Sequence, residues 1–194
     1  MILPIVRYND PVLRAKGKEV KEITDEHRAL AKDMLETMRA AHGVGLAAQQ
    51  IGVALQMAVI DVSHDPTCVS YCRVNGEDKP VTEIMPLVFV NPKLELGKEK
   101  ETNEEGCLSF PDLRENIRRA SDVKATFTTL DGQTMILETD GLLGRALQHE
   151  TDHLHGILFI DRLSAAAKIG LKRKLKRLME DWEEEDMKAA EKTA

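Results

Sequence analysis

The chain has 194 residues, of which 42% are hydrophobic and 31% are charged, and these proportions describe an ordinary globular protein with a sizeable core. Its formal net charge of −6 argues against a general affinity for nucleic acid, and no run of about 18 apolar residues is present that could cross a membrane. The three cysteines and an N-terminal stretch without the layout of a secretory signal argue against a disulfide framework and favour a cytoplasmic location.

The first predicted element is a helix over residues 24–41. Thr24 is suited to its N-cap position, and Gly43 is suited to end it. Apolar residues recur with helical spacing along this segment. They are Leu30, Met34, Leu35, Met38 and Ala41. Small residues follow in GVGLAAQQIG at 43–52 and predict a tightly packed segment.

Two buried strands are predicted in the next part of the chain. LQMAVIDV at 55–62 and LVFVNP at 87–92 are apolar runs of the length that strands usually have, and the chain stays extended after the second one. The residues between them, 63–86, are polar and contain proline and glycine, which predicts a loop or an insertion. Cys68 and Cys72 lie in this segment and are predicted to be free surface thiols rather than ligands of a second metal.

A β-hairpin and a helix are predicted in the C-terminal half. The runs VKATFTTL and QTMILE flank Asp131–Gly132, a dipeptide typical of two-residue hairpin turns. Asp140 then fits the N-cap of a helix that ends near Gly156. The apolar residues ILFIDRL at 157–163 predict a further short strand.

A charged helix is predicted from Ser164 onward. Its narrow apolar stripe consists of Leu171, Leu175, Leu178 and Trp182. Six basic residues between Lys168 and Arg177 precede six acidic residues between Glu180 and Asp186. The elements together predict an α+β fold, with one domain over residues 1–163 and an appended amphipathic helix over 164–194.

The sequence QHETDHLHG, from Gln148 to Gly156, indicates a metal site on the preceding helix. Residues i and i+4 share one face of a helix, with Cβ atoms about 5–6 Å apart, so His149 and His153 can bind one metal ion. Glu150 lies about 100° further around the helix and can reach a water molecule near that ion, as the general base of an HExxH motif does. His155 points away from this face. Within the predicted α+β fold, we expect antiparallel sheets packed around a central HExxH helix.

A catalytic metal site needs a third protein ligand. Cys107, in the sequence EEGCLSF, is a candidate because a thiolate is a strong ligand for a first-row divalent metal. An acidic residue downstream of the helix is the alternative, as in many zinc proteases, and only the run at Glu180–Asp186 offers one. That run has the composition of a helix surface, so Cys107 is the better candidate on chemical grounds.

Three motifs occur in order along the chain: GVGLAAQQ at 43–50, EGCLS at 105–109 and QHETDHL at 148–154. In this combination the chain strongly resembles the peptide deformylases, over the region from Asn9 to Leu163. Residue 49 departs from the family pattern, because it is often proline there and is glutamine here. Members of the family remove the N-formyl group from formyl-methionine at the start of nascent polypeptides and release formate.

The resemblance implies one divalent metal ion with three protein ligands and a water molecule in the fourth position. The implied ligands are Cys107, His149 and His153. Fe²⁺ is usual in the family, and Zn²⁺, Ni²⁺ or Co²⁺ can occupy the site. Glu150 would transfer the proton, while the side-chain amide of Gln50 and the backbone N–H of Leu108 would stabilise the developing oxyanion.

The resemblance also implies where the substrate binds. Glycines at 43 and 45 let a peptide approach the backbone closely and pair with it as an added strand, and apolar residues would line a pocket for the methionine side chain. The substrate-binding residues expected on this basis are Gly43, Val44, Gly45, Leu142 and Ala146. Glu105 is expected to anchor the EGCLS motif or to be solvated, and Arg145 to lie at the surface or in an ion pair.

The nascent formyl-methionyl peptide is the expected partner, and the ribosome is a second one. Some bacterial members of the family carry a C-terminal helix that docks on the ribosome, and the basic run at 168–177 would suit rRNA phosphates. Two other functions stay open. A zinc metalloprotease would cleave ordinary peptide bonds with a third ligand other than Cys107. A non-catalytic ribosome-binding protein with a structural metal would need neither Glu150 nor Gln50.

Overall fold

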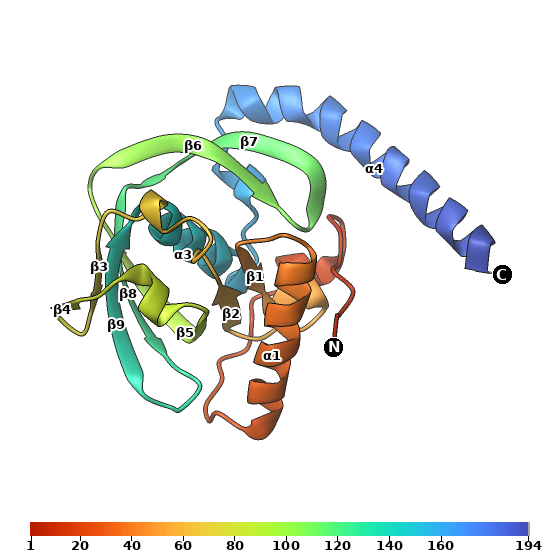
Figure 1. Cartoon of the computed structure of the whole chain (residues 1–194). Helices are drawn as coiled ribbons and strands as arrows, with labels where there is room; N and C mark the ends of the chain where they lie inside the picture. The colour runs from red at the N-terminus through yellow and green to blue at the C-terminus, as the bar shows by residue number, and fades with distance from the viewer. Residues whose placement is uncertain (194) are drawn as a thin grey trace.

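The computed structural model describes residues 1–193, with side chains through residue 188. Antiparallel strands form a seven-stranded sheet in the order β1-β2-β5-β8-β9-β3-β4, and β6 and β7 form a separate hairpin (Figure 1). The large sheet contains β1 (Gly45–Ala47), β2 (Met57–Ile60), β3 (Cys72–Val74), β4 (Glu77–Asp78), β5 (Leu87–Leu96), β8 (Asp122–Thr128) and β9 (Thr134–Asp140). The hairpin strands are β6 (Lys100–Cys107) and β7 (Phe110–Ala120). The helices are α1 (Asp25–Ala40), α2 (Val81–Ile84), α3 (Gly141–Leu154) and α4 (Ala165–Thr193), with 3₁₀ turns η1 (Pro11–Arg14), η2 (Ala48–Ile51), η3 (Pro66–Cys68) and η4 (Phe159–Arg162).

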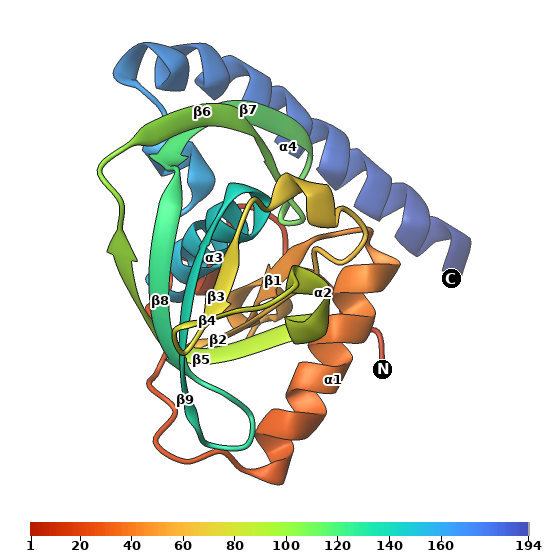
Figure 2. The same ribbon diagram turned by 60° about the vertical axis from the view of Figure 1, so that its left-hand side comes forward.

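Helix α3, which carries the HExxH motif, lies at the centre of the fold. Its residues from Leu143 to Leu154 are all buried, and Figure 2 shows the strands of both sheets curving around it. Asp140 is its N-cap and Gly156 follows its end with φ 72°, a backbone conformation that a residue without Cβ adopts freely. The predicted α+β fold with antiparallel sheets around a central HExxH helix is confirmed.

Helix α1 packs beside the end of the large sheet formed by β1 and β2. Its N-cap is Thr24, as predicted, and its buried face includes Met34 and Met38. These methionines join Leu46 and Met57 in one hydrophobic cluster. The cluster supports the GVGLAAQQ segment from behind and leaves its other side facing α3.

The hairpin of β6 and β7 is the largest feature that the sequence analysis does not predict. Its strands pair from Lys100 opposite Ala120 to Gly106 opposite Arg114, and a shift of register then brings Cys107 opposite Phe110. The irregular end of the hairpin therefore holds the cysteine of the EGCLS motif.

Two other segments contradict the sequence prediction. Residues 63–86 are not simply a loop, because β3 pairs with β9 and extends the large sheet. Cys72 is consequently buried at 5% exposure, whereas Cys68 is exposed as predicted. Residues 157–163 contain the 3₁₀ turn η4 instead of a strand, and the backbone N–H of Leu158 donates there to the carboxylate of Asp161 at 2.8 Å.

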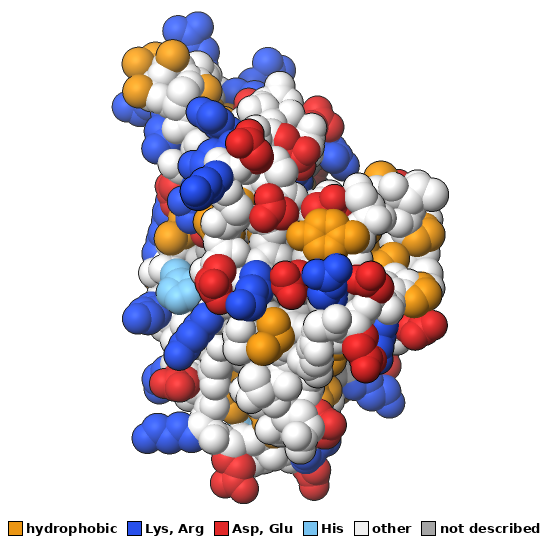
Figure 3. All heavy atoms as spheres, turned by 90° about the vertical axis from the view of Figure 1, so that its left-hand side faces the viewer, with side chains coloured by type: hydrophobic (Ala, Val, Ile, Leu, Met, Phe, Trp, Pro, Cys, Tyr) orange, Lys and Arg blue, Asp and Glu red, His pale blue; other side chains and the backbone are white. Residues whose placement is uncertain are grey.

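Helix α4 packs on the hairpin through its predicted apolar stripe. Leu171, Leu175 and Trp182 are buried in a hydrophobic cluster with Phe110 and Ile117 of β7. The basic residues of α4 face outward, and Figure 3 shows basic side chains gathered at the upper end of the molecule, where α4 begins. Among residues 1–193, no helix combines the length and the apolar character needed to cross a membrane.

Candidate active site

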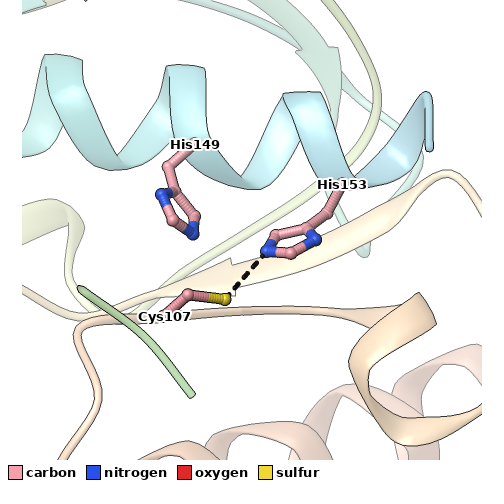
Figure 4. Close-up of side chains that lie close together, drawn as sticks. All are labelled: Cys107, His149 and His153. Carbon is pink, nitrogen blue, oxygen red and sulfur yellow. Dashed lines mark hydrogen bonds between the residues drawn. The ribbon is translucent and has the colours of Figure 1, made fainter. Parts of the chain in front are cut away.

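The cysteine of β6 and the two histidines of α3 point toward one another (Figure 4). Cys107, His149 and His153 each offer one ligand atom, and these atoms all lie within 4.8 Å of one another. A thiolate and two imidazoles over this span are a donor set that suits a first-row divalent metal, so the residues fit the metal that the sequence implies. The alternative acidic run lies elsewhere, since Asp186 pairs with Arg7 at 3.0 Å.

Glu105 fixes the orientation of His149. Its Oε2 accepts a hydrogen bond from His149 Nδ1 at 3.0 Å, which leaves the other ring nitrogen free to bind a metal ion. Its other partners are Arg119 Nε at 2.6 Å and Arg145 Nη1 at 2.8 Å. Burial would raise the pKa of Glu105, but the hydrogen bonds from His149 and Arg119 hold it well below its usual value, so the carboxylate stays ionised.

Both charged residues left undecided by the sequence are therefore buried. Glu105 is 6% exposed and anchors the EGCLS motif, and Arg145 is 7% exposed and ion-paired rather than at the surface. No local signal in the sequence distinguishes these two from the exposed charges around them. The carboxylate of Glu105 is paired with Arg145 and also with Arg119, and Arg119 comes from a strand that the sequence does not predict.

Glu150 lies beside the ligands and out of contact with bulk water. It is 4% exposed, and its Oε2 has no hydrogen-bond partner within the described part of the chain. Burial raises the pKa of Glu150 to about 7, so the carboxyl can both accept and return a proton near neutral pH. Gly45 makes room for it, because a Cβ at residue 45 would lie 2.8 Å from Cδ and 2.9 Å from Cγ of Glu150.

A hydrogen bond from the backbone fixes the orientation of the side-chain amide of Gln50. Its Oε1 accepts a hydrogen bond from the backbone N–H of Ala47 at 2.9 Å. The nitrogen is therefore turned toward the candidate ligands, 3.4 Å from Cys107 Sγ and 3.3 Å from Ser109 Oγ. The neighbouring Gln49 is also buried but extends toward Gly17, so Gln50 is the one of these two glutamines that presents a donor to the site.

A cavity of about 630 Å³ opens beside these groups. Its lining includes Gln50, Cys107, Leu108, His149 and Glu150. The predicted substrate-binding residues Gly43, Val44, Gly45, Leu142 and Ala146 line it as well. The sequence analysis misses the wall contributed by the start of β7, which includes Phe110, Leu113 and Arg114, because that strand shows no simple alternation of apolar residues.

Comparison with known proteins shows the family of the chain. The model of the polypeptide deformylase family matches residues 2–169. The peptide deformylase of Methylacidiphilum infernorum is 46% identical over 178 residues, which cover 92% of this chain and 93% of that protein. The peptide deformylase of Acinetobacter baumannii is 41% identical over 185 residues, covering 95% of this chain and 96% of that protein.

Solved structures of peptide deformylases share the fold of this chain. The crystal structure of a peptide deformylase from Legionella pneumophila superposes with a TM-score of 0.76 at 34% identity, covering 93% of this chain and 96% of that one. The structure of the Thermotoga maritima enzyme superposes with a TM-score of 0.72 at 35% identity, covering 84% of this chain and 99% of that one. The matched family model, the identity with these relatives and the shared fold together show that the chain belongs to the peptide deformylase family.

Proposed function

We propose that Cys107, His149 and His153 hold one divalent metal ion and that Glu150 transfers the proton in the reaction of the family. That reaction is the metal-dependent removal of the N-formyl group from formyl-methionine on nascent polypeptides, with release of formate. The observation that carries the proposal is the buried Glu150 carboxyl beside three ligand atoms and an open cavity. We place the reaction in the cytoplasm, where new polypeptides emerge.

The chemistry divides between the ion and the side chains around it. A bound divalent ion supplies Lewis acidity, which lowers the pKa of a water molecule and polarises the formyl carbonyl. Glu150 accepts a proton from the water molecule as its oxygen bonds to the formyl carbon, and it returns that proton to the amine nitrogen as the C–N bond breaks. The amide nitrogen of Gln50 and the backbone N–H of Leu108 donate to the carbonyl oxygen as its negative charge develops.

The cavity is suited to a methionine side chain and to a peptide in extended conformation. Val44, Leu142 and Ala146 provide apolar lining for the side chain. The residues at 43 and 45 lack side chains, and β1 is the end strand of the large sheet. Its outer side can therefore pair with a substrate backbone as an added strand.

The activity is tested with two blocked peptides. We expect formate release from formyl-Met-Ala-Ser and no release of acetate from its N-acetyl analogue. An N-blocked protein incubated in parallel should gain no new amino termini. New termini from internal cleavage, without formate release, would support the metalloprotease alternative.

We propose Fe²⁺ as the metal in the cell, although the donor set also suits Zn²⁺, Ni²⁺ or Co²⁺. A thiolate bound to Fe²⁺ is sensitive to oxidation. We expect one iron per chain in protein purified without oxygen, with activity that falls on exposure to air. Stoichiometric zinc in the anaerobic preparation would contradict this choice of metal.

We further propose that residues 1–163 perform the catalysis and that the basic face of α4 contacts the ribosome. The proposal is supported by the packing of α4, since its apolar stripe faces the hairpin and its basic residues Lys172, Arg173 and Arg177 are exposed. Part of the acidic run is turned toward the body of the protein, where Glu185 and Asp186 pair with Arg7. The acidic residues therefore oppose RNA binding less than the sequence suggests.

Charge reversal is a cleaner test of ribosome contact than truncation, because truncation after Leu163 would uncover the cluster beneath α4. We expect Lys172→Glu combined with Arg173→Glu to weaken cosedimentation with ribosomes and to leave activity on short peptides unchanged. Lys98→Glu combined with Lys100→Glu, two exposed lysines near the start of β6, is the matched control. Equal binding by the two double variants would refute the contact.

A further inference from the structure

The proposed metal ligands belong to two elements that share no backbone pairing. Cys107 ends β6, whereas His149 and His153 lie on α3, and the β6–β7 hairpin forms a sheet of its own. Within the described residues, no backbone hydrogen bond joins α3 to the hairpin. The distance between the thiolate and the imidazoles therefore depends on side chains that connect the helix to the hairpin.

These connecting side chains occupy one face of α3. Arg145, Gln148, His149 and Asp152 have the spacing i, i+3, i+4 and i+7, which places them on one side of a helix. Gln148 Nε2 donates to the backbone oxygen of Ala120 at 3.0 Å, and Gln148 Oε1 accepts from the backbone N–H of the same residue at 3.1 Å. Asp152 accepts a hydrogen bond from Arg119 at 2.8 Å. All four side chains are buried, so the connection is a polar seam inside the protein.

Arg145 makes the broadest connection in this seam. Its Nη1 donates to Glu105 Oε1 at 2.8 Å and to the backbone oxygen of Ile117 at 3.0 Å, and its Nη2 reaches the Glu101 carboxylate at 3.3 Å. Glu101 and Glu105 belong to β6 and Ile117 to β7, so one guanidinium holds both strands of the hairpin. We propose that Arg145 is a positioning residue that sets the Cys107 thiolate at the correct distance from the two histidines.

Arg145 can be removed with less disturbance than Arg119. Arg119 holds both Glu105 and Asp152, and its loss would leave two buried carboxylates without a cation. Without Arg145, the carboxylate of Glu105 keeps its two bonds from Arg119, and the carboxylate of Glu101 is 40% exposed and can be hydrated. Substitution of Arg145 therefore loosens the link between helix and hairpin while the charges of Glu105 and Asp152 stay paired.

The inference rests on the proposed metal site, and it is tested by the release of Co²⁺ to an excess of chelator in the absence of substrate. Absorption from the bond between thiolate and cobalt reports Cys107 directly. Loss of partners that orient metal ligands typically lowers metal affinity about 10–100-fold, so we expect Arg145→Met to release Co²⁺ at least tenfold faster than the wild type. Arg145→Lys, which keeps a cation with fewer donors, should fall between them.

Arg118→Met is the matched control, because Arg118 is an exposed arginine on β7, the strand that Arg145 contacts at Ile117. We expect this variant to release Co²⁺ at the wild-type rate. A lower melting temperature of metal-free Arg145→Met, together with unchanged Co²⁺ release well below that temperature, would show a purely structural role and overturn the inference. Should Arg145→Met fail to fold, Arg145→Lys decides, and release at the wild-type rate would overturn the inference. A wild-type protein without the thiolate–cobalt band would refute the metal site itself.

Discussion

Gly45 lies where the backbone of β1 passes the Glu150 side chain, so a single added methyl group tests the role of that carboxylate. The Cβ of Gly45→Ala would lie 2.8 Å from Cδ and 2.9 Å from Cγ of Glu150, and van der Waals contact between carbon atoms needs about 3.5–4.0 Å. Glu150 must therefore retreat by about 1 Å. Misplacement of a reacting group by this amount can cost about 10²-fold in rate.

We expect metal-loaded Gly45→Ala to release formate from formyl-Met-Ala-Ser with kcat lowered about 100-fold. Its metal content should equal that of the wild type, because the methyl group meets Glu150 rather than a proposed ligand. Gly144→Ala is the control, since the same methyl group on α3 meets its nearest atoms at 3.5 Å and should leave kcat within about twofold of the wild type. Full turnover by Gly45→Ala with bound metal would refute the reasoning that the position of Glu150 controls the rate.

Three other substitutions have defined outcomes. Gln50→Leu removes a proposed oxyanion donor, so kcat for formate release should fall about 10²–10³-fold while metal analysis shows the ion retained. Asp161 has a pKa below its usual value, because hydrogen bonds from Arg14 and the backbone N–H of Leu158 outweigh burial. The contribution of this carboxylate to the free energy of unfolding is therefore complete above the unfolded-state pKa and is lost as pH falls through the folded-state pKa. Urea unfolding should show that Asp161→Asn is less stable than the wild type at pH 7 and that the difference shrinks below about pH 4. Gln49 is buried without a partner for either amide atom in the described residues, so Gln49→Met should raise the free energy of unfolding by about 1 kcal/mol, and an unchanged urea midpoint would contradict this.

The central helix could be predicted from local signals. Asp140 and Gly156 mark its ends, and His149 and His153 are separated by one helical turn, so the sequence alone places two ligand side chains on one face. Cys107 needed more than local reasoning. Its thiolate chemistry made it a better candidate than a downstream acidic residue, and the likeness of three motifs to a known family then identified it as the implied third ligand. The structure brings the three side chains together, while their function as ligands remains a proposal.

The β6–β7 hairpin could not be predicted because its stability depends on distant residues. β6 reads KETNEEGC and has no apolar alternation, and its one fully buried side chain is the ionised Glu105. That carboxylate is buried because Arg119 and Arg145 approach it from β7 and α3. The sequence gives no sign of such a pairing across 14 and 40 residues.

The predictions for two short segments were wrong for a different reason. The apolar run at 157–163 has the length and composition of a strand, and short apolar runs do not distinguish strands from helical turns by periodicity. The carboxylate of Asp161 and the backbone N–H of Leu158 close this segment into η4. β3 has only three residues and is recognisable only through its pairing with β9.

The most direct test of the account compares formate release by Fe²⁺-loaded wild type and Glu150→Ala, both prepared without oxygen and both shown to contain one iron per chain. We expect rapid release by the wild type and a loss of at least about 10²–10⁴-fold in the variant, the range that a general base contributes. Equal release by the two proteins would contradict the assignment of proton transfer to Glu150. Absence of release by the iron-loaded wild type would contradict the proposed reaction.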